Sequence, residues 1–275
     1  MLKKLLKYDF ISVFKYWWIA ALSSFVLSFV GGGCITVLNT DRELPQIVYP
    51  FTIIGLILVI LSFVVFSILS VILVYVRFYK NFFTDEGYLT FTLPVKRTQL
   101  LNSKLIMGVS TIFITATVCI INVLIMVCIG FSDTIFSKFY WEGFGSVINA
   151  IIDELGAYLI IYVIEVFVIV ILSVIFSALF IFCCITFASI ITKKAKVITA
   201  IGIYYVANGI FSFVGQMFYL FGITSLAGWL SELPAGSEYG VIALILLGLI
   251  CFFGVFCTLL YTLQYWMIDR KLNLS

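Results

Sequence analysis

The sequence predicts an all-α integral membrane protein with six transmembrane helices, short amphipathic interfacial helices, and both termini in the cytoplasm. Of its 275 residues, 64% are hydrophobic and only 11% are charged, whereas about 25% of the residues in soluble domains are charged. Six runs contain no charged residue, and each is longer than the ~20 apolar residues that a membrane-spanning helix needs. These runs are 16–40, 44–76, 105–132, 166–192, 197–231 and 239–268.

The distribution of charge predicts the orientation. If the N-terminus is cytoplasmic, 14 of the 16 Lys and Arg residues fall in inner segments, and only Arg42 and Lys138 fall outside. Eight of the thirteen acids fall outside. Cytoplasmic loops of membrane proteins carry an excess of Lys and Arg. We therefore expect a multi-pass protein of the plasma membrane, built as a single domain over residues 1–275.

The first expected spanning helix, 17–38, follows residues 2–16, where leucines alternate with lysines at helical spacing. This pattern is typical of a short helix in the inner headgroup layer. Small residues recur every four positions on one face of the spanning helix, which allows another helix to approach closely. Contact within the subunit and contact between subunits both remain open for this stripe of Ala20, Ser24, Ser28 and Gly32.

The second helix, 49–76, tolerates Pro50 near its start, where little backbone hydrogen bonding is lost. After the third helix, 105–131, residues 132–154 carry apolar side chains at spacings of three and four, which predicts an amphipathic helix on the outer surface. The apolar run 155–192 contains 38 residues, about 57 Å of helix, too long for one ~30 Å crossing. It must begin in the interface or break, with the spanning part at 160–192.

The fifth and sixth helices, 197–224 and 240–266, are separated by a turn-like outer segment that contains Pro234 and Gly236. A short basic stretch, TKKAK, precedes the fifth helix. No internal repeat is evident, which weakens the case for a secondary transporter built from inverted halves.

The residues that several kinds of catalytic, metal-binding and nucleotide-binding sites require are absent from the sequence. The chain has no histidine, which excludes histidine-based catalytic triads and metal sites. It has no Gly-Lys dipeptide, so the phosphate-binding G-x-x-x-x-G-K-[ST] loop is missing. Nothing matches a nucleic-acid-binding motif. We expect no catalytic site, no metal and no cofactor on this chain. If the protein uses ATP, another chain must bind ATP and Mg²⁺.

Four polar residues are candidates for an intramembrane polar site. Glu165 stands at the edge of an apolar run, and an ionisable group in a membrane helix is costly. The 27 uncharged residues that follow it are enough to span the membrane, so an acid at the outer interface is the alternative to a transport site. The neutral candidates, which suit hydrogen bonds between helices, are Asn122, Asn208 and Gln216.

The segment 77–104, which we expect to be cytoplasmic, interrupts the apolar sequence with charged residues, a proline and several aromatic residues. Its apolar content is more than a solvated connection needs, so something should cover it. From periodicity alone it is a docking loop or an interfacial segment. Its apolar residues are Phe82, Phe83, Tyr88, Leu89, Phe91 and Leu93.

A resemblance narrows these alternatives. The stretch DEGYLTFTLPVKRTQLLNSKL, residues 85–105, resembles the segment between helices two and three of bacterial ABC transporter permeases of the type-two exporter class. ITKKAKVITAIGIYYVAN and the terminal YWMIDRKLNLS are also similar to that family. In the family, the first segment is a coupling helix that docks on the ATP-binding subunit. The resemblance implies this role for Asp85, Glu86, Gly87, Leu93, Pro94 and Lys104. In the same segment we expect Tyr88 and Phe91 to contribute apolar contacts to the ATPase and Lys96 and Arg97 to orient it by charge.

The resulting hypothesis is the membrane subunit of an ATP-driven exporter, working with an ATP-binding subunit and with a second permease copy or a homologous permease. The family implies an amphipathic substrate such as an antimicrobial peptide, a drug or a lipid. Two alternatives remain: an ion-coupled transporter or channel centred on Glu165, and a membrane scaffold or immunity protein that transports nothing.

Overall fold

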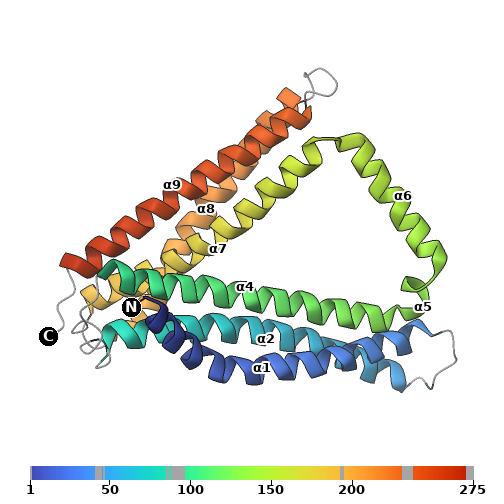
Figure 1. Cartoon of the computed structure of the whole chain (residues 1–275), viewed down its shortest axis with the longest axis horizontal. Coiled ribbons are helices and arrows are strands. Elements are labelled where there is room, and N and C mark those ends of the chain that lie inside the picture. The colour runs from blue at the N-terminus through green and yellow to red at the C-terminus, as the bar shows by residue number, and fades with distance from the viewer. Residues whose placement is uncertain are drawn as a thin grey trace. The chain divides into compact units, whose positions relative to one another are not determined.

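The computed structural model describes residues 2–40, 45, 47–84, 87, 97–192, 195–230 and 238–270. These residues are almost entirely helical (Figure 1). The long helices are α1 (Leu2–Asn39), α2 (Val48–Phe83), α4 (Arg97–Gly130), α7 (Tyr158–Ile191), α8 (Lys196–Leu230) and α9 (Glu238–Arg270), and the shorter ones are α5 (Ser132–Ile135) and α6 (Lys138–Leu155). Within the described residues, six helices are long and apolar enough to cross a membrane. The predicted fold class is confirmed, while the orientation in the membrane remains a prediction.

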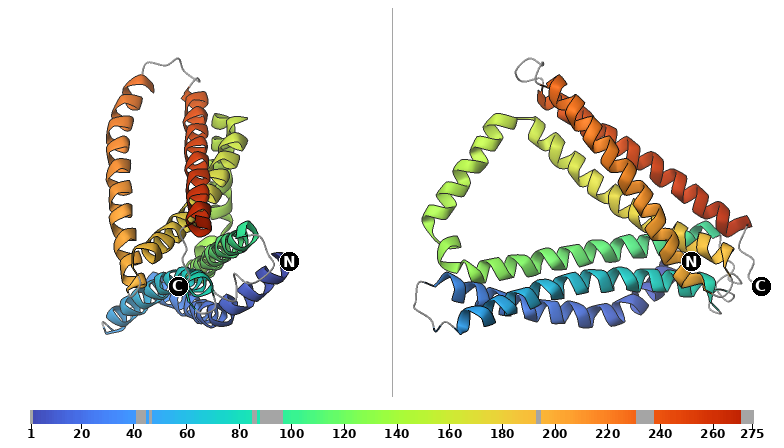
Figure 2. Two further views of the ribbon diagram at one scale, coloured as in Figure 1. Left: turned by 90° about the vertical axis from the view of Figure 1, so that its left-hand side faces the viewer. Right: turned by 180° about the vertical axis from the view of Figure 1, so that it is seen from behind.

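The chain expected as one domain divides into two compact units. Unit 1 contains Met1–Phe78 and Asn102–Ala150, and unit 2 contains Tyr79–Leu101 and Ile151–Ser275. Each unit is built around three long helices, α1, α2 and α4 in unit 1 and α7, α8 and α9 in unit 2 (Figure 2).

In unit 1, α1 and α4 run parallel and meet along a seam of buried polar contacts. Trp17 Nε1 donates to Thr115 Oγ1 at 2.9 Å, and Asn122 Nδ2 donates to Ser24 Oγ at 3.0 Å. The paired residues are seven apart on each helix, so one face of α1 meets one face of α4 over several turns. Farther out, the backbones approach closely at Gly32, where an added Cβ would lie 2.6 Å from Ile129 Cβ.

Helix α2 runs antiparallel to α1 and completes the core of unit 1. The ring centroids of Trp17 and Phe66 are 5.6 Å apart. Both side chains are buried with Ala21, and Phe14 and Leu73 cover this cluster. Because lipid tails are as apolar as these side chains, the packing relies on shape and on the polar contacts of the seam more than on exclusion of water.

In unit 2, α7 packs against both α8 and α9. Along the α7–α9 contact, Gln264 Nε2 donates to Thr186 Oγ1 at 2.8 Å, and Tyr162 Oη donates to the backbone oxygen of Tyr239 at 2.7 Å. Aromatic rings fill the space between α7, α8 and α9. Phe176 lies 5.7 Å from Phe211 and 5.8 Å from Phe253, measured between ring centroids.

The structure refines the predicted boundaries. The amphipathic stretch 2–16 and the first spanning helix form one continuous helix of 38 residues, because no glycine or proline occurs before Gly31 to interrupt it. The long run 155–192 breaks at its start, at Gly156, whose φ of 52° separates α6 from α7. A side chain disfavours this left-handed conformation, and glycine adopts it readily.

The amphipathic helix predicted before residue 155 is present as α6, and none of its residues is buried. It starts later than expected, because α5 ends at Ile135 and α6 begins only at Lys138, directly after Ser137. The Ser137 hydroxyl accepts a hydrogen bond from the Tyr140 backbone nitrogen at 3.3 Å, which satisfies one of the free donors at the start of α6.

Candidate functional site

The two ends of the segment 77–104, which is predicted to be cytoplasmic, are helical. Helix α2 continues past residue 76 to Phe83, and α4 begins at Arg97 rather than at 105. Gly87 lies close to the end of α2, since its nitrogen donates to the Thr84 oxygen at 2.7 Å. An added Cβ at Gly87 would lie 2.8 Å from the Phe82 oxygen, so this close approach requires glycine. The predicted site residues Asp85, Glu86, Tyr88, Phe91, Leu93, Pro94 and Lys96 lie outside the described residues.

Arg97 is bound within the chain, at the first turn of α4. Its Nη1 donates to Asp269 Oδ1 at 2.6 Å and to the Asp269 backbone oxygen at 2.7 Å. The two side chains are 45% and 42% exposed, so the pair contributes little stability in water. It joins the start of α4 to the end of α9 inside unit 2.

Lys104, predicted to contact the ATPase, is a buried residue. Only 2% of it is exposed, and its Nζ lies 2.5 Å from Asp9 Oδ1 of α1, which is 3% exposed. Arg77 Nε of α2 lies 3.6 Å from the same oxygen, and this side chain is 23% exposed. Asp9, Arg77 and Lys104 form a buried ionic cluster in unit 1. The side chain of Lys104 therefore serves a contact inside the chain.

We did not predict this ionic cluster from the sequence, because Asp9 stands as a single acid among the N-terminal lysines. The sequence nevertheless contains a signal for it. Asp9 stands eight residues before Trp17 and fifteen before Ser24, so the three share one face of a continuous helix. An acid on the face that carries the other buried residues of a membrane helix indicates a buried cationic partner.

The stripe of small residues packs inside the subunit. Ser24 and Ser28 are buried, and Ser24 accepts the hydrogen bond from Asn122. Gly32 faces Ile129 of α4, and Ala20 packs against the buried cluster around Trp17. The sequence left open whether this stripe packs within the subunit or between subunits, and in the structure it packs against α4 of the same chain.

The neutral polar candidates separate into two kinds. Asn122 is fully buried in the α1–α4 seam. Asn208 and Gln216 lie on α8 and are exposed. Amides turned toward hydrocarbon are costly unless another helix bonds to them.

Glu165 is buried, with 8% of the residue exposed. It lies seven residues before Leu172, whose backbone oxygen accepts from Cys257 Sγ of α9 at 3.7 Å. Glu165 therefore shares the face of α7 that packs against α9. Within the described residues, its Oε2 has no hydrogen-bond partner.

Tyrosines surround the outer end of the α7–α9 contact. The rings of Tyr158 and Tyr239 are 6.1 Å apart, those of Tyr158 and Tyr162 are 6.3 Å apart, and Tyr239 Oη donates to Glu154 Oε1 at 3.3 Å. No group of three or more Cys, Asp or Glu side chains within the described part of the chain is placed to hold a metal ion.

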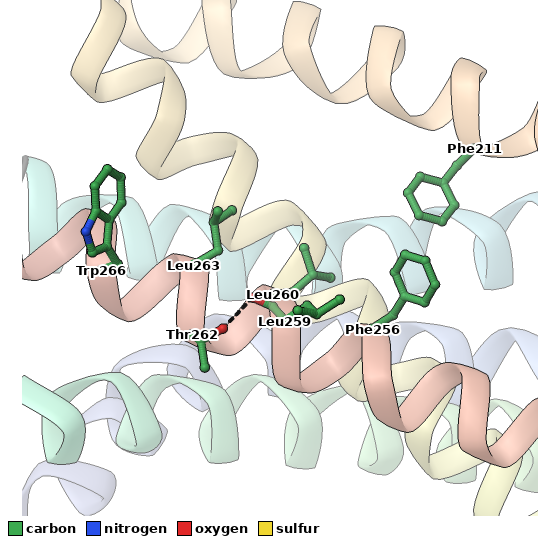
Figure 3. Close-up of a pocket in the computed structure, with 7 residues that line it drawn as sticks. All are labelled: Phe211, Phe256, Leu259, Leu260, Thr262, Leu263 and Trp266. Carbon is green, nitrogen blue, oxygen red and sulfur yellow. Dashed lines mark hydrogen bonds between the residues drawn. The ribbon is translucent and has the colours of Figure 1, made fainter.

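An open apolar groove of about 620 Å³ lies between α8 and α9. Figure 3 shows Phe211 of α8 facing Phe256 of α9 at one end, with Trp266 at the other. The hydroxyl of Thr262, a polar group on its lining, donates to the Leu259 backbone oxygen at 2.9 Å. The lining residues bear no charge, so this groove suits an acyl chain or an apolar side chain and carries no acid–base chemistry.

Comparison with protein-family models, curated proteins and solved structures gives no match to the chain.

Proposed function

We propose that this chain is the membrane-spanning subunit of an ATP-driven exporter of the ABC type, coupled to a separate ATP-binding subunit through the segment 77–104. The observation that carries the proposal is the sequence of that segment, which combines charges with apolar residues between the second and third of six apolar helices. The structure supports it by giving the segment helical ends, so that contact with a partner can be passed to α2 and α4.

The partners and the substrate belong to the same proposal. ATP and Mg²⁺ bind to the partner chain, because this sequence lacks a phosphate-binding loop. A second permease copy or a homologous permease completes the pathway, and the exposed amides of Asn208 and Gln216 on α8 support a further helical partner. An amphipathic substrate, or membrane lipid, fits the apolar groove between α8 and α9.

Docking is tested by replacing Phe91 and Leu93 together by Ser. Buried apolar anchors contribute about 2 kcal/mol or more each at an interface, so the double variant should weaken ATPase binding about 1,000-fold. We expect co-purification of the ATPase and stimulated ATP hydrolysis to be lost while membrane insertion is kept. Lys96→Glu should weaken binding mainly at low salt, because a charge at the edge of an interface is screened.

The matched control is the replacement of Phe136 and Phe139 by Ser. These aromatics are 77% and 86% exposed, and they lie on the predicted outer side, away from any cytoplasmic ATPase. The control should bind and stimulate the ATPase as the unaltered protein does. If the Phe91 and Leu93 variant also binds normally, or if no ATPase co-purifies with the unaltered protein, the coupling role fails and a scaffold without transport becomes the better hypothesis.

A second candidate function is ion-coupled transport centred on Glu165. The burial of this carboxyl group, with one oxygen lacking a hydrogen-bond partner among the described residues, favours it. Transport in sealed vesicles distinguishes the two functions. Transport driven by a proton or sodium gradient without ATP, and lost in Glu165→Gln, supports the ion-coupled function. ATP-dependent transport that persists in Glu165→Gln supports the exporter.

A further inference from the structure

The ionic cluster of Asp9, Arg77 and Lys104 joins the two ends of the cytoplasmic segment. Arg77 is the first residue of the segment 77–104, and Lys104 is the last. Both cations lie against Oδ1 of Asp9, Lys104 Nζ at 2.5 Å and Arg77 Nε at 3.6 Å. A single carboxylate on α1 therefore contacts the end of α2 and the beginning of α4.

The burial of this cluster makes the connection stiff. Asp9 and Lys104 are 3% and 2% exposed, so water screens their attraction little. Removing the Asp9 carboxylate would take from the buried Lys104 ammonium the anion that lies 2.5 Å away, which is unfavourable. An exposed pair such as Arg97 with Asp269, in contrast, can separate and be solvated at little cost.

Helix α1 can carry a displacement away from the cluster. It is continuous over 38 residues, about 57 Å at 1.5 Å per residue. Beyond Asp9 it is joined to α4 by the Trp17–Thr115 and Ser24–Asn122 hydrogen bonds. A movement of the cluster would therefore shift α1 and α4 together.

We propose that Asp9 is a positioning residue for the cytoplasmic segment. Its carboxylate holds the two ends of the segment in a fixed relation and passes movement of the segment to α1. The transmission to α1 rests on the proposed function, whereas the positioning of the two ends does not. The two parts are therefore tested by separate measurements.

The first measurement is the distance between spin labels at Lys80 and Gln99, which are exposed on the two helical parts of the segment, near its two ends. Labels are placed in the full chain, with its native cysteines replaced, in lipid nanodiscs. Asp9→Asn should at least double the width of the distance distribution. Asp9→Glu, which keeps the carboxylate, should stay close to the unaltered width.

Thr115→Val is the matched control. It removes one buried polar contact of the same two helices, the acceptor for Trp17 Nε1, farther from the segment. A general loosening of the α1–α4 seam would broaden the distribution in the control as much as in Asp9→Asn. The proposal predicts the unaltered width for the control, and equal broadening in both variants overturns it.

A double variant covers the case in which Asp9→Asn fails to fold. Asp9→Asn with Lys104→Met removes both nearly fully buried charges, a change that proteins often tolerate. We expect this variant to fold and still show the doubled width, because the tie between the ends is gone. A folded double variant with the unaltered width overturns the proposal.

The second measurement is ATP hydrolysis by the complex with the co-purified ATP-binding subunit. Stimulated hydrolysis should fall at least tenfold in Asp9→Asn and in the double variant, and it should change less than twofold in Asp9→Glu, which keeps the carboxylate. Normal stimulation despite a doubled width overturns the transmission to α1. If no ATPase co-purifies with the unaltered protein, the proposed function and the transmission fail together, and the spin-label distances alone decide the positioning role.

Discussion

Two adjacent glycines of α1 lie in opposite environments, and this difference predicts opposite effects of the same substitution. An alanine Cβ at Gly32 would lie 2.6 Å from Ile129 Cβ and 2.8 Å from Ile129 Cγ2. At Gly33, no atom lies within 4 Å of the added carbon. Gly32→Ala therefore disturbs the α1–α4 contact, and Gly33→Ala is its control.

The size of the effect follows from the geometry. Carbon atoms in contact are about 3.5–4.0 Å apart, so the helices must separate by about 1 Å at Gly32. Ile129 Cβ cannot move aside by a rotamer change, because it is attached directly to the backbone. Overpacking of this kind costs about 1–3 kcal/mol, whereas a substitution into open space changes stability by about 0.5 kcal/mol or less.

Thermal unfolding in detergent measures the difference. With about 2–4 °C of Tm per kcal/mol, Gly32→Ala should lower the Tm by about 2–12 °C, and Gly33→Ala should leave it within about 2 °C. Equal Tm values for the two variants would refute the assignment of Gly32 to the α1–α4 contact. A dimer that dissociates in Gly32→Ala without a change in Tm would instead place this stripe between subunits.

Three further predictions concern the α7–α9 contact, the break before α7 and the orientation in the membrane. Thr186→Val should lower stability by about 0.5–2 kcal/mol in the same unfolding assay, because it removes the acceptor of the buried Gln264 amide. Restoration by adding Gln264→Leu would confirm that the unsatisfied amide is the cause. Gly156→Val should destabilise the chain by about 1–2 kcal/mol through its φ of 52°, and Gly156→Asn should cost less, because asparagine adopts this conformation more readily. Once the seven native cysteines have been replaced, a cysteine at Lys138 should react with an impermeant thiol reagent in intact cells, and a cysteine at Lys80 should not. Labelling at Lys80 would show that the predicted orientation is wrong.

Much of the fold could be predicted from local properties of the sequence. The six apolar runs correspond to α1, α2, α4, α7, α8 and α9, because each spanning segment must satisfy its own backbone hydrogen bonds in lipid. The amphipathic pattern before residue 155 correctly predicted the helix of α6. The length of the run 155–192 indicated that it begins in the interface or breaks; the structure has a break only at Gly156, and α7 still continues for 34 residues.

The contacts of the predicted site residues could not be predicted from local properties of the sequence. Lys104 and Arg97 are cations in the segment that is predicted to be cytoplasmic, and residue type alone favours a surface role for both. The structure buries Lys104 against Asp9, 95 positions earlier in the chain, and leaves Arg97 partly exposed beside Asp269. Sequence spacing cannot predict such pairs, because they depend on the register between helices that are far apart in the chain.

The sequence by itself determined the number of spanning helices, their approximate ends and the class of the protein, since these depend on the apolar length of each segment. Only the tertiary structure decided which face of each helix is buried, as Gly32 and Gly33 illustrate. In a soluble protein, the buried face is marked by its apolar residues. In a membrane, lipid-facing and protein-facing surfaces are equally apolar, so close approach and polar pairs such as Ser24 with Asn122 select the contact, and these arise only once two helices have met.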